Sequence, residues 1–471
     1  MKRILLIGLI VMLIVVLSNL RSIEAAPSGF SNPINISTNL GDSILPQITV
    51  SGNDVYVLWN DNATGKFGIF LTKSTDGGTN FGMPVNISKN IGSSGSPQFA
   101  VSGNNGYVVW QAQATGKYQI LFAKSTDGGA TFSTPVNISN NSGDSSFPKI
   151  LVSENNIYVT WAFTVTTTDY DVLFSKSTDG GATFSTPVNL SNTVRDTGLP
   201  QMAISGNNIY ITWENNGSGN FDVFVAKSTD SGNTFSTPVN VSKNPKSSGA
   251  PQIVASGNDV YVAWMDNTPG NYDVFVAKST DNASTFGTPV NVSNNTSDSG
   301  YQQIALSENN LYVAWTDTIS DINYEVLVSK STDGGATFST PVNLSKNAGA
   351  SGWPQVVVSG NIYVIWEDIT TGNYDILISK STDSGATFDT PVNISNTKDD
   401  SNFKQMVLSD NNIYVVWQDG SKNQHEILFA KSTTFVPEFG TLASLVLLVA
   451  ILSTIILFTK TIPRLKINSI F

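Results

Sequence analysis

The sequence predicts an all-β protein, a single eight-bladed β-propeller of four-stranded blades, and three observations lead to this prediction. The chain has 471 residues, 40% of them hydrophobic and only 13% charged, which is enough apolar material for a large folded body. Tryptophan recurs every 51 or 52 residues, and such a period indicates an array of small units. Each unit holds four short strand patterns separated by turn residues. The recurring tryptophans are Trp59, Trp110, Trp161, Trp213, Trp264, Trp315, Trp366 and Trp417.

The unit that begins at Pro251 shows the four expected strands in order. Residues 251–256 form the first, and 258–264 form the second, in which β-branched and aromatic residues alternate. Residues 272–278 form the third and 288–293 the fourth, with Asn, Asp, Gly, Pro and Ser between them. Four strands in about 50 residues are typical of one propeller blade.

The turn between the third and fourth strands carries the most specific motif. It reads Ser-Thr-Asp-Gly-Gly-Ala-Thr-Phe at 125–132, 177–184 and 331–338, with variants at 74–81, 228–235, 279–286 and 381–388. This motif resembles the Asp-box of sialidase-like (BNR) repeat proteins, which implies a propeller fold. We expect the aspartates to accept hydrogen bonds from their own turn and so to be structural. They are Asp76, Asp127, Asp179, Asp230, Asp281, Asp333 and Asp383.

One Asp-box lacks its glycines. It has Asn282-Ala283-Ser284 where other copies have glycine. Because asparagine tolerates the left-handed conformation, we expect this turn to survive with a shifted pivot.

The number of each strand type predicts how the ring closes. The chain has eight Pro-x-Asn-x-Ser fourth strands, but the first of them, at 33–37, precedes the first tryptophan strand. The last third strand, ending at Lys431, has no fourth strand after it. We therefore expect the N-terminal strand to complete the last blade, which removes two unpaired edges. An open solenoid is the alternative.

Both ends of the chain differ from the propeller, which we assign to 27–435. Residues 1–26 have a basic start, an apolar run and Ala25-Ala26, and they read as a signal peptide or, alternatively, an uncleaved anchor. Residues 441–459 are apolar and form a predicted transmembrane helix, for which a buried helix is the alternative. The basic tail 460–471 predicts a cytoplasmic end and an extracellular propeller.

The segment before this span carries a second resemblance. Residues 436–440 read Val-Pro-Glu-Phe-Gly, and with the span and basic tail they resemble the PEF/PEFG-type sorting signals of archaeal surface proteins. The resemblance implies that a sorting enzyme removes the tail and attaches the protein to a lipid. The expected partner is therefore the membrane, through the helix or through a lipid.

Composition excludes several functions. Cysteine is absent, so no disulfide or thiolate site exists, and the single histidine excludes a multi-histidine metal centre. The net charge of −11 opposes nucleic acid as a partner. The resemblance to sialidases implies a clamp of three arginines, yet only Arg195 lies in the propeller, so sialidase activity is not expected.

Acidic residues gather in the loops from second to third strands and between blades. This arrangement predicts either an acidic mouth that binds a sugar or Ca²⁺, or merely solvated turns; we predict no cofactor and no committed metal site. Trp353 breaks the repeat just before Pro354 and either stacks on a sugar or fills a blade interface. The binding candidates are Trp353, Asp266, Asp317, Glu367, Asp368 and Asp419.

The fourth strands supply candidate glycosylation sites, because the asparagine in each of them begins an Asn-x-Ser sequon. The alternative is that Asn and Ser simply alternate on a polar strand. The sites are Asn35, Asn86, Asn137, Asn189, Asn240, Asn291, Asn343 and Asn393.

Together these patterns predict a cell-surface, membrane-anchored propeller with a non-catalytic envelope, adhesion or glycan-binding role, its partner a glycan or another surface protein. The alternative is a secreted glycan hydrolase that uses carboxylates of the loop face, since such hydrolysis needs only two carboxylates at a suitable separation.

Overall fold

The computed structural model describes residues 29–432, except 39–40, 90, 115, 165–169, 192–196, 218, 321, 348, 410–411 and 422–423. The predicted signal segment, sorting-type motif, membrane span and basic tail lie outside these residues, as does Arg195. No helix within the described residues is long and apolar enough to span a bilayer.

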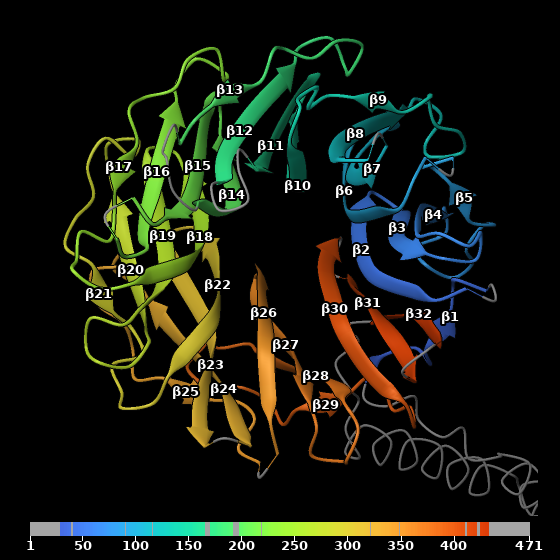
Figure 1. Ribbon diagram of the computed structural model, residues 1–471. Helices are drawn as coiled ribbons and strands as arrows, with labels where there is room; N and C mark the ends of the chain where they lie inside the picture. The colour runs from blue at the N-terminus through green and yellow to red at the C-terminus, as the bar shows by residue number, and fades with distance from the viewer. Residues whose placement is uncertain are drawn as a thin grey trace, which may run out of the picture.

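The described residues form eight four-stranded antiparallel sheets, arranged as blades around a central opening (Figure 1). Blades 1 to 7 each take four consecutive strands, from β2–β5 to β26–β29, and blade 8 has the order β1-β32-β31-β30. This confirms the predicted all-β, eight-bladed propeller of four-stranded blades.

The strands fall into four concentric positions. The innermost, which surround the opening, are β2 (Ser43–Ser51), β6 (Ser94–Ser102), β10 (Asp144–Ser153), β14 (Thr197–Ser205), β18 (Ser248–Ser256), β22 (Ser299–Ser307), β26 (Ser351–Ser359) and β30 (Asp400–Ser409). The second strands are β3 (Asp54–Asp61), β7 (Asn105–Gln113), β11 (Asn156–Thr164), β15 (Asn208–Asn215), β19 (Asp259–Asp266), β23 (Asn310–Ser320), β27 (Asn361–Asp368) and β31 (Asn412–Ser421). The third strands are β4 (Gly68–Ser74), β8 (Tyr118–Ser125), β12 (Tyr170–Ser177), β16 (Asp222–Ser228), β20 (Asp273–Ser279), β24 (Asn323–Ser331), β28 (Asp375–Ser381) and β32 (Gln424–Lys431). The outermost are β1 (Ile34–Asn35), β5 (Val85–Asn86), β9 (Val136–Asn137), β13 (Val188–Asn189), β17 (Val239–Asn240), β21 (Val290–Asn291), β25 (Val342–Asn343) and β29 (Val392–Asn393).

The apolar core lies between the blades. The buried residues divide into eight clusters, and every cluster combines side chains of two adjacent blades. The repeated tryptophan of each second strand is buried and packs toward the preceding blade; Trp110, for example, shares a cluster with Tyr56 and Leu71. Second strands are apolar on both faces because both faces meet a neighbouring blade.

The N-terminal strand closes the ring, as the sequence predicts. Ile34 pairs with Phe429 and Asn35 with Leu428, while the backbone N–H of Ile36 donates to the carbonyl of Ile427 at 2.9 Å. Ile36 is buried in the cluster shared by blades 8 and 1.

A second contact lies at the same seam. The imidazole Nδ1 of His425 is 2.7 Å from Oδ1 of Asp42, and its backbone N–H donates to the same oxygen at 3.0 Å. Asp42 follows the N-terminal strand, and His425 lies in β32, so this pair joins the two ends of the ring.

Lysines at the ends of several third strands join their blade to the next. The Lys124 ammonium donates to the carbonyl of Gly180 at 3.1 Å, and Lys176 donates to the carbonyl of Ser231 at 2.9 Å. Lys431 repeats the contact across the seam by donating to the carbonyl of Gly77 at 2.7 Å. The last blade thus contacts the first through the same bond that joins internal blades.

Closure predicts that Ile36 stabilises the fold as much as its counterpart inside the ring. Ile36 and Ile138 occupy equivalent positions and are equally buried. We expect Ile36→Ala and Ile138→Ala each to lower the free energy of unfolding by about 2–5 kcal/mol in urea titrations, because each leaves a cavity. A neutral Ile36→Ala beside a destabilising Ile138→Ala would contradict closure through this strand.

Candidate functional site

Every innermost strand contains a β-bulge at the same place. The register against the second strand shifts there in all eight described blades, for instance between Gly352 and Gln355. Seven bulges begin with a non-glycine residue whose φ lies between 49° and 54°. These residues are Leu45, Ser96, Phe147, Ala250, Tyr301, Trp353 and Phe403.

The preceding blade holds these strained bulges in place. The Trp353 backbone N–H donates to Oγ1 of Thr316 at 3.1 Å, and that of Phe403 donates to Oε1 of Glu367 at 2.9 Å. The Ala250 N–H donates to Oε2 of Glu214 at 2.7 Å. A left-handed conformation is unfavourable for bulky residues, so such bonds are needed to fix it. The bulge turns its side chain away from the blade interface.

Three aromatic side chains meet at this level in blades 6 and 7. The ring centroids of Tyr301 and Trp353 are 5.8 Å apart, and those of Trp353 and Tyr374 are 6.3 Å apart. Tyr301 is 60% exposed and Trp353 is 41% exposed. We call Tyr301, Trp353 and Tyr374 the aromatic mouth. Trp353 is therefore partly exposed, and its ring packs against Tyr301 of the neighbouring blade.

A pocket of about 300 Å³ lies beside the aromatic mouth and is lined by the innermost strands of blades 5 to 8. Its polar lining consists mainly of amide side chains: Gln252, Gln302, Gln303, Gln355 and Gln405. Gln302 is buried and donates to the carbonyl of Ala250 at 2.5 Å, while its Oε1 accepts no hydrogen bond from the described residues. Gln355 bonds through both atoms of its amide to the backbone of Met406, so the pocket combines aromatic faces with amides of which some serve the fold.

A buried ion pair supports the wall of this pocket. The Lys404 ammonium is 3.3 Å from Oε1 of Glu367 and also donates to the carbonyl of Trp353. Burial lowers the pKa of Lys404, and the Glu367 charge opposes that shift. Because Glu367 also accepts from Phe403, its carboxylate fixes the bulges of blades 7 and 8 rather than facing the pocket as a free acid.

The other four predicted acids, Asp266, Asp317, Asp368 and Asp419, lie buried at the ends of second strands. Asp266 accepts from the hydroxyl of Ser248 at 2.9 Å, the indole N–H of Trp264 at 2.9 Å and the backbone N–H of Thr268 at 2.9 Å. The hydroxyls of Ser351 and Ser401 each donate at 2.6 Å, to Asp368 and Asp419 respectively.

Asp317 has the same surroundings. It accepts from Ser299 at 2.5 Å and from Trp315 at 2.7 Å, while burial raises the pKa of its carboxyl group and these donors oppose the shift. Together the four aspartates tie first strands to second strands, and the structure does not gather them with Trp353.

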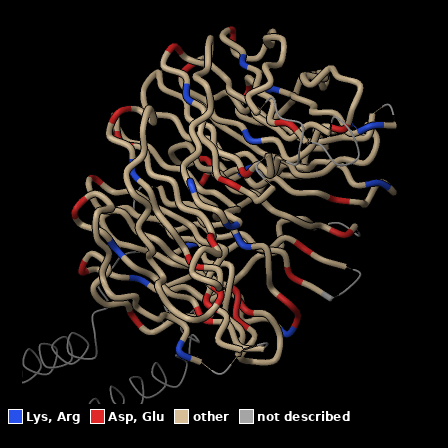
Figure 2. Tube along the Cα trace, turned by 60° about the vertical axis from the view of Figure 1, so that its left-hand side comes forward, with Lys and Arg blue, Asp and Glu red and all other residues tan. Residues whose placement is uncertain are grey.

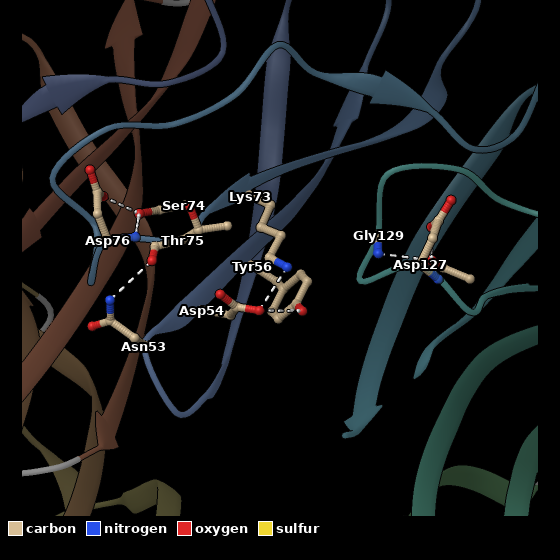
Figure 3. Close-up of polar contacts among 10 residues, drawn as sticks. Asn53, Asp54, Tyr56, Lys73, Ser74, Thr75, Asp76, Asp127 and Gly129 are labelled. Carbon is tan, nitrogen blue, oxygen red and sulfur yellow. Dashed lines mark hydrogen bonds and ion pairs between the residues drawn. The ribbon is translucent and has the colours of Figure 1, made fainter. Parts of the chain in front are cut away.

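The Asp-box turns lie at the opposite end of the blades. In the copy at 74–81, the Ser74 hydroxyl donates to Asp76 at 2.7 Å (Figure 3). In the copy at 125–132, the Ser125 hydroxyl donates to Asp127 at 2.7 Å, and the Gly129 N–H donates to the Ser125 oxygen at 2.8 Å. Thr131 donates to the same carboxylate through its backbone N–H at 2.9 Å and its hydroxyl at 2.6 Å. Equivalent bonds surround Asp76, Asp179, Asp230, Asp281, Asp333 and Asp383.

The Asp-box without glycine keeps its pivot, contrary to the expected shift. Asn282 and Ala283 take φ values of 57° and 58°, where Gly77 and Gly78 have 65° and 76°. The neighbour in blade 4 explains this tolerance. A Cβ at Gly78 would lie 2.5 Å from the ring of Phe429, whereas Ala283 shares its cluster with the smaller Val225.

The sequon asparagines also make bonds within the fold. The amide of Asn189 donates to Asp171 at 2.8 Å, and that of Asn291 donates to Asp273 at 2.7 Å. In the Asn137 sequon, the Ser139 hydroxyl donates to the Asn137 carbonyl at 2.9 Å. These bonds give the motif a structural role, and glycosylation at the eight positions stays a prediction.

Charged side chains are sparse on the strands. Acidic residues recur along two opposite edges of the molecule in Figure 2, where the turns lie. Within the described residues, no group of three or more acidic or histidine side chains is placed to hold a metal ion. The Ca²⁺ alternative for the acidic mouth therefore finds no such cluster among the described residues.

The comparisons with known proteins give likenesses at low identity. No protein-family model and no curated protein matches the sequence. An ulvan lyase of polysaccharide lyase family PL25 is 12% identical, with a TM-score of 0.48 over 78% of this chain and 93% of that chain. The intramolecular trans-sialidase of Ruminococcus gnavus is 15% identical, with a TM-score of 0.39 over 73% and 95%. The Trypanosoma rangeli sialidase is 11% identical, with a TM-score of 0.41 over 89% and 62%. These likenesses place the chain in no family.

Sequence reasoning missed most of the pocket. It singled out Trp353, but not Tyr301 or Phe403 at the same position of neighbouring repeats, nor the amides that follow the bulges. Aligning the eight repeats would have shown an aromatic residue at the position of Trp353 in four of them, as Phe147, Tyr301, Trp353 and Phe403. The ion pair between Glu367 and Lys404 joins two blades, so the sequence of a single repeat does not predict it.

The Asp-box carboxylates predict acid sensitivity. Hydrogen bonds from Thr131 and Ser125 lower the pKa of Asp127 to about 2, and those from Thr285 and Ser279 lower the pKa of Asp281 to about 2. An aspartate in the unfolded chain has a pKa of about 3.9, so this stabilisation is present above that pH and is lost as the pH falls toward 2. We expect the urea midpoint to fall between pH 4 and pH 2.

The matched control for this pH dependence is Asp127→Asn. It should lower the midpoint at pH 7 and make the drop below pH 4 smaller than in the wild type. A wild-type midpoint that stays constant from pH 4 to pH 2 contradicts the assignment.

Proposed function

We propose that this protein is a non-catalytic, glycan-binding β-propeller anchored at the outer face of a cell membrane. The observation that carries the proposal is the aromatic mouth beside the amide-lined pocket. The apolar face of a sugar ring packs on aromatic side chains, and its hydroxyl groups exchange hydrogen bonds with amides. Tyr301 and Trp353 offer the aromatic surface, and the amide side chains of Gln252, Gln303 and Gln405 line the pocket beside it.

The position of the pocket also supports binding. It lies at the innermost strands, where four blades contribute side chains, and the bulges that present Trp353 and Phe403 are fixed by bonds from the preceding blade. A preorganised aromatic group loses little conformational entropy when a ligand binds.

The alternative, a glycan hydrolase, needs two carboxylates flanking the bond to be cleaved, one of them able to donate a proton. The acid that supports this pocket, Glu367, is held by Lys404 and by the Phe403 backbone. The predicted aspartates serve as acceptors inside their blades. The arrangement therefore favours binding over hydrolysis.

The location is proposed from the ends of the chain. Residues 1–26 read as an export signal, and 441–459 as a membrane span preceded by the sorting-type motif 436–440. Either the helix or an attached lipid would hold the propeller outside the cell, where a glycan or a glycosylated surface protein is the available partner. The net charge of −11 opposes nucleic acid as a partner.

The test is a glycan array probed with the full-length protein in detergent. We expect Trp353→Ala to weaken binding to the bound glycans roughly tenfold or more, about 1.4 kcal/mol, because it removes the central ring of the aromatic mouth. Phe147→Ala is the matched control, since it removes an exposed aromatic residue at the bulge of blade 3, away from the pocket. It should leave binding unchanged.

Two results would overturn the proposal. One is wild-type protein that binds no glycan, or binds equally well after Trp353→Ala. The other result is that the wild-type protein cleaves a bound glycan and the Glu367→Gln variant does not. That result would establish the hydrolase alternative.

A further inference from the structure

The first residue after each bulge forms a ring of side chains on the innermost strands. In seven blades this residue is glutamine, and in four of them it lines the pocket. Blade 3 has Lys149 at this position. Lys149 pairs with Thr160 of the second strand, just as Gln252 pairs with Ala263 in blade 5. The seven glutamines are Gln47, Gln98, Gln201, Gln252, Gln303, Gln355 and Gln405.

Lys149 is half-buried in the channel wall without a counter-ion. Its ammonium group makes no hydrogen bond or ion pair with the described residues, and burial lowers the pKa of that group. Lys404, the other lysine at this level, differs because Glu367 lies 3.3 Å away. Lys149 is therefore the cation of this ring whose charge the described residues do not balance.

An unpaired, partly desolvated ammonium group costs free energy, and a bound anion offsets that cost. Amide N–H groups donate hydrogen bonds to anionic oxygens as well. The neighbouring blades place Gln98 and Gln201 at the ring positions on either side of Lys149. A single cation between amide donors suits a carboxylate or sulfate group.

We infer that the channel at Lys149 is an anion-binding subsite that takes the carboxylate or sulfate group of an acidic glycan. The glycan part of this inference rests on the proposed function, but the anion site does not, because Lys149 lies in blade 3 and outside the aromatic mouth. The pocket of blades 5 to 8 is lined mainly by neutral amides, so the charge preference comes from this separate position on the innermost strand of blade 3.

The anion site is tested without any glycan. The full-length protein is labelled with an amine-acylating reagent at increasing sodium sulfate or sodium acetate, at constant ionic strength, and acylation of each lysine is measured by mass spectrometry. We expect one or both anions to slow acylation of Lys149 saturably, and not that of Lys246, which is exposed on a loop between blades. Equal effects at both lysines would overturn the inference. The anion that protects Lys149 more strongly shows whether the subsite prefers a sulfate or a carboxylate group.

The charge preference is tested with oligogalacturonate and its uncharged methyl ester by calorimetry, and with a sulfated oligosaccharide and its desulfated form. The acidic form that matches the protective anion should bind about tenfold more tightly than its neutral partner. Lys149→Gln should remove this preference and still fold, because it gives blade 3 the residue of the other seven blades; Lys246→Gln should retain it. A preference that survives Lys149→Gln would overturn the inference.

The two proposals fail in different ways. If anions protect Lys149 but the protein binds no glycan, the anion subsite is supported and the proposed function is contradicted. Glycan binding that depends on Trp353, with no anion protection and no charge preference, leaves the function and removes the subsite.

Discussion

A single blade of this protein cannot bury its own apolar faces, and the rest of the structure follows from that constraint. Each of the eight clusters needs side chains from two blades, so every interface requires a neighbour on both sides. A row of blades would leave two apolar faces in water, whereas a ring leaves none. Pairing of Ile34 with Phe429 and the bond from Lys431 to Gly77 make the last interface equivalent to the others.

The same constraint fixes most polar residues of the repeat. Serines, aspartates and asparagines tie first strands to second strands and outermost strands to third strands, as Ser248 does with Asp266 and Asn291 with Asp273. These positions cannot change without leaving a buried polar group unpaired. The bulge residue is different, because its backbone is fixed while its side chain is free. It varies from Ala250 to Trp353 at nearly the same φ, and variation there gives blades 6 and 7 their aromatic mouth.

The fold could be predicted from the sequence, whereas the site could be predicted only in part. The reason is that strands and turns depend on residues within one repeat, while the site depends on contacts between strands and between blades. Alternating residues around Trp264 and the turn chemistry of the Asp-box determine strands within one repeat, and the spare strand at 33–37 determines closure. Whether Asp266 faces solvent depends on the pairing of Ser248 with Asp266 between β18 and β19, and the residue pattern does not specify that register. The bulges have no such signal either, since glycine is absent from the position that takes a positive φ. Trp353 was recognised because it broke the pattern, while Tyr301 was missed because it resembled an ordinary strand residue.

The seam has a consequence for how the chain folds. Ile34 and Phe429 meet across almost the whole length of the propeller, and the cluster that holds Trp59 also needs Tyr414 and Ile427. Blade 1 therefore lacks one of its two interfaces until β32 has been synthesised, although it is made first. Contacts so distant in sequence form slowly, and apolar surface stays exposed in the meantime. The interface between blades 8 and 1 can therefore form only after the whole propeller sequence is available, whereas the other seven interfaces need only neighbouring repeats.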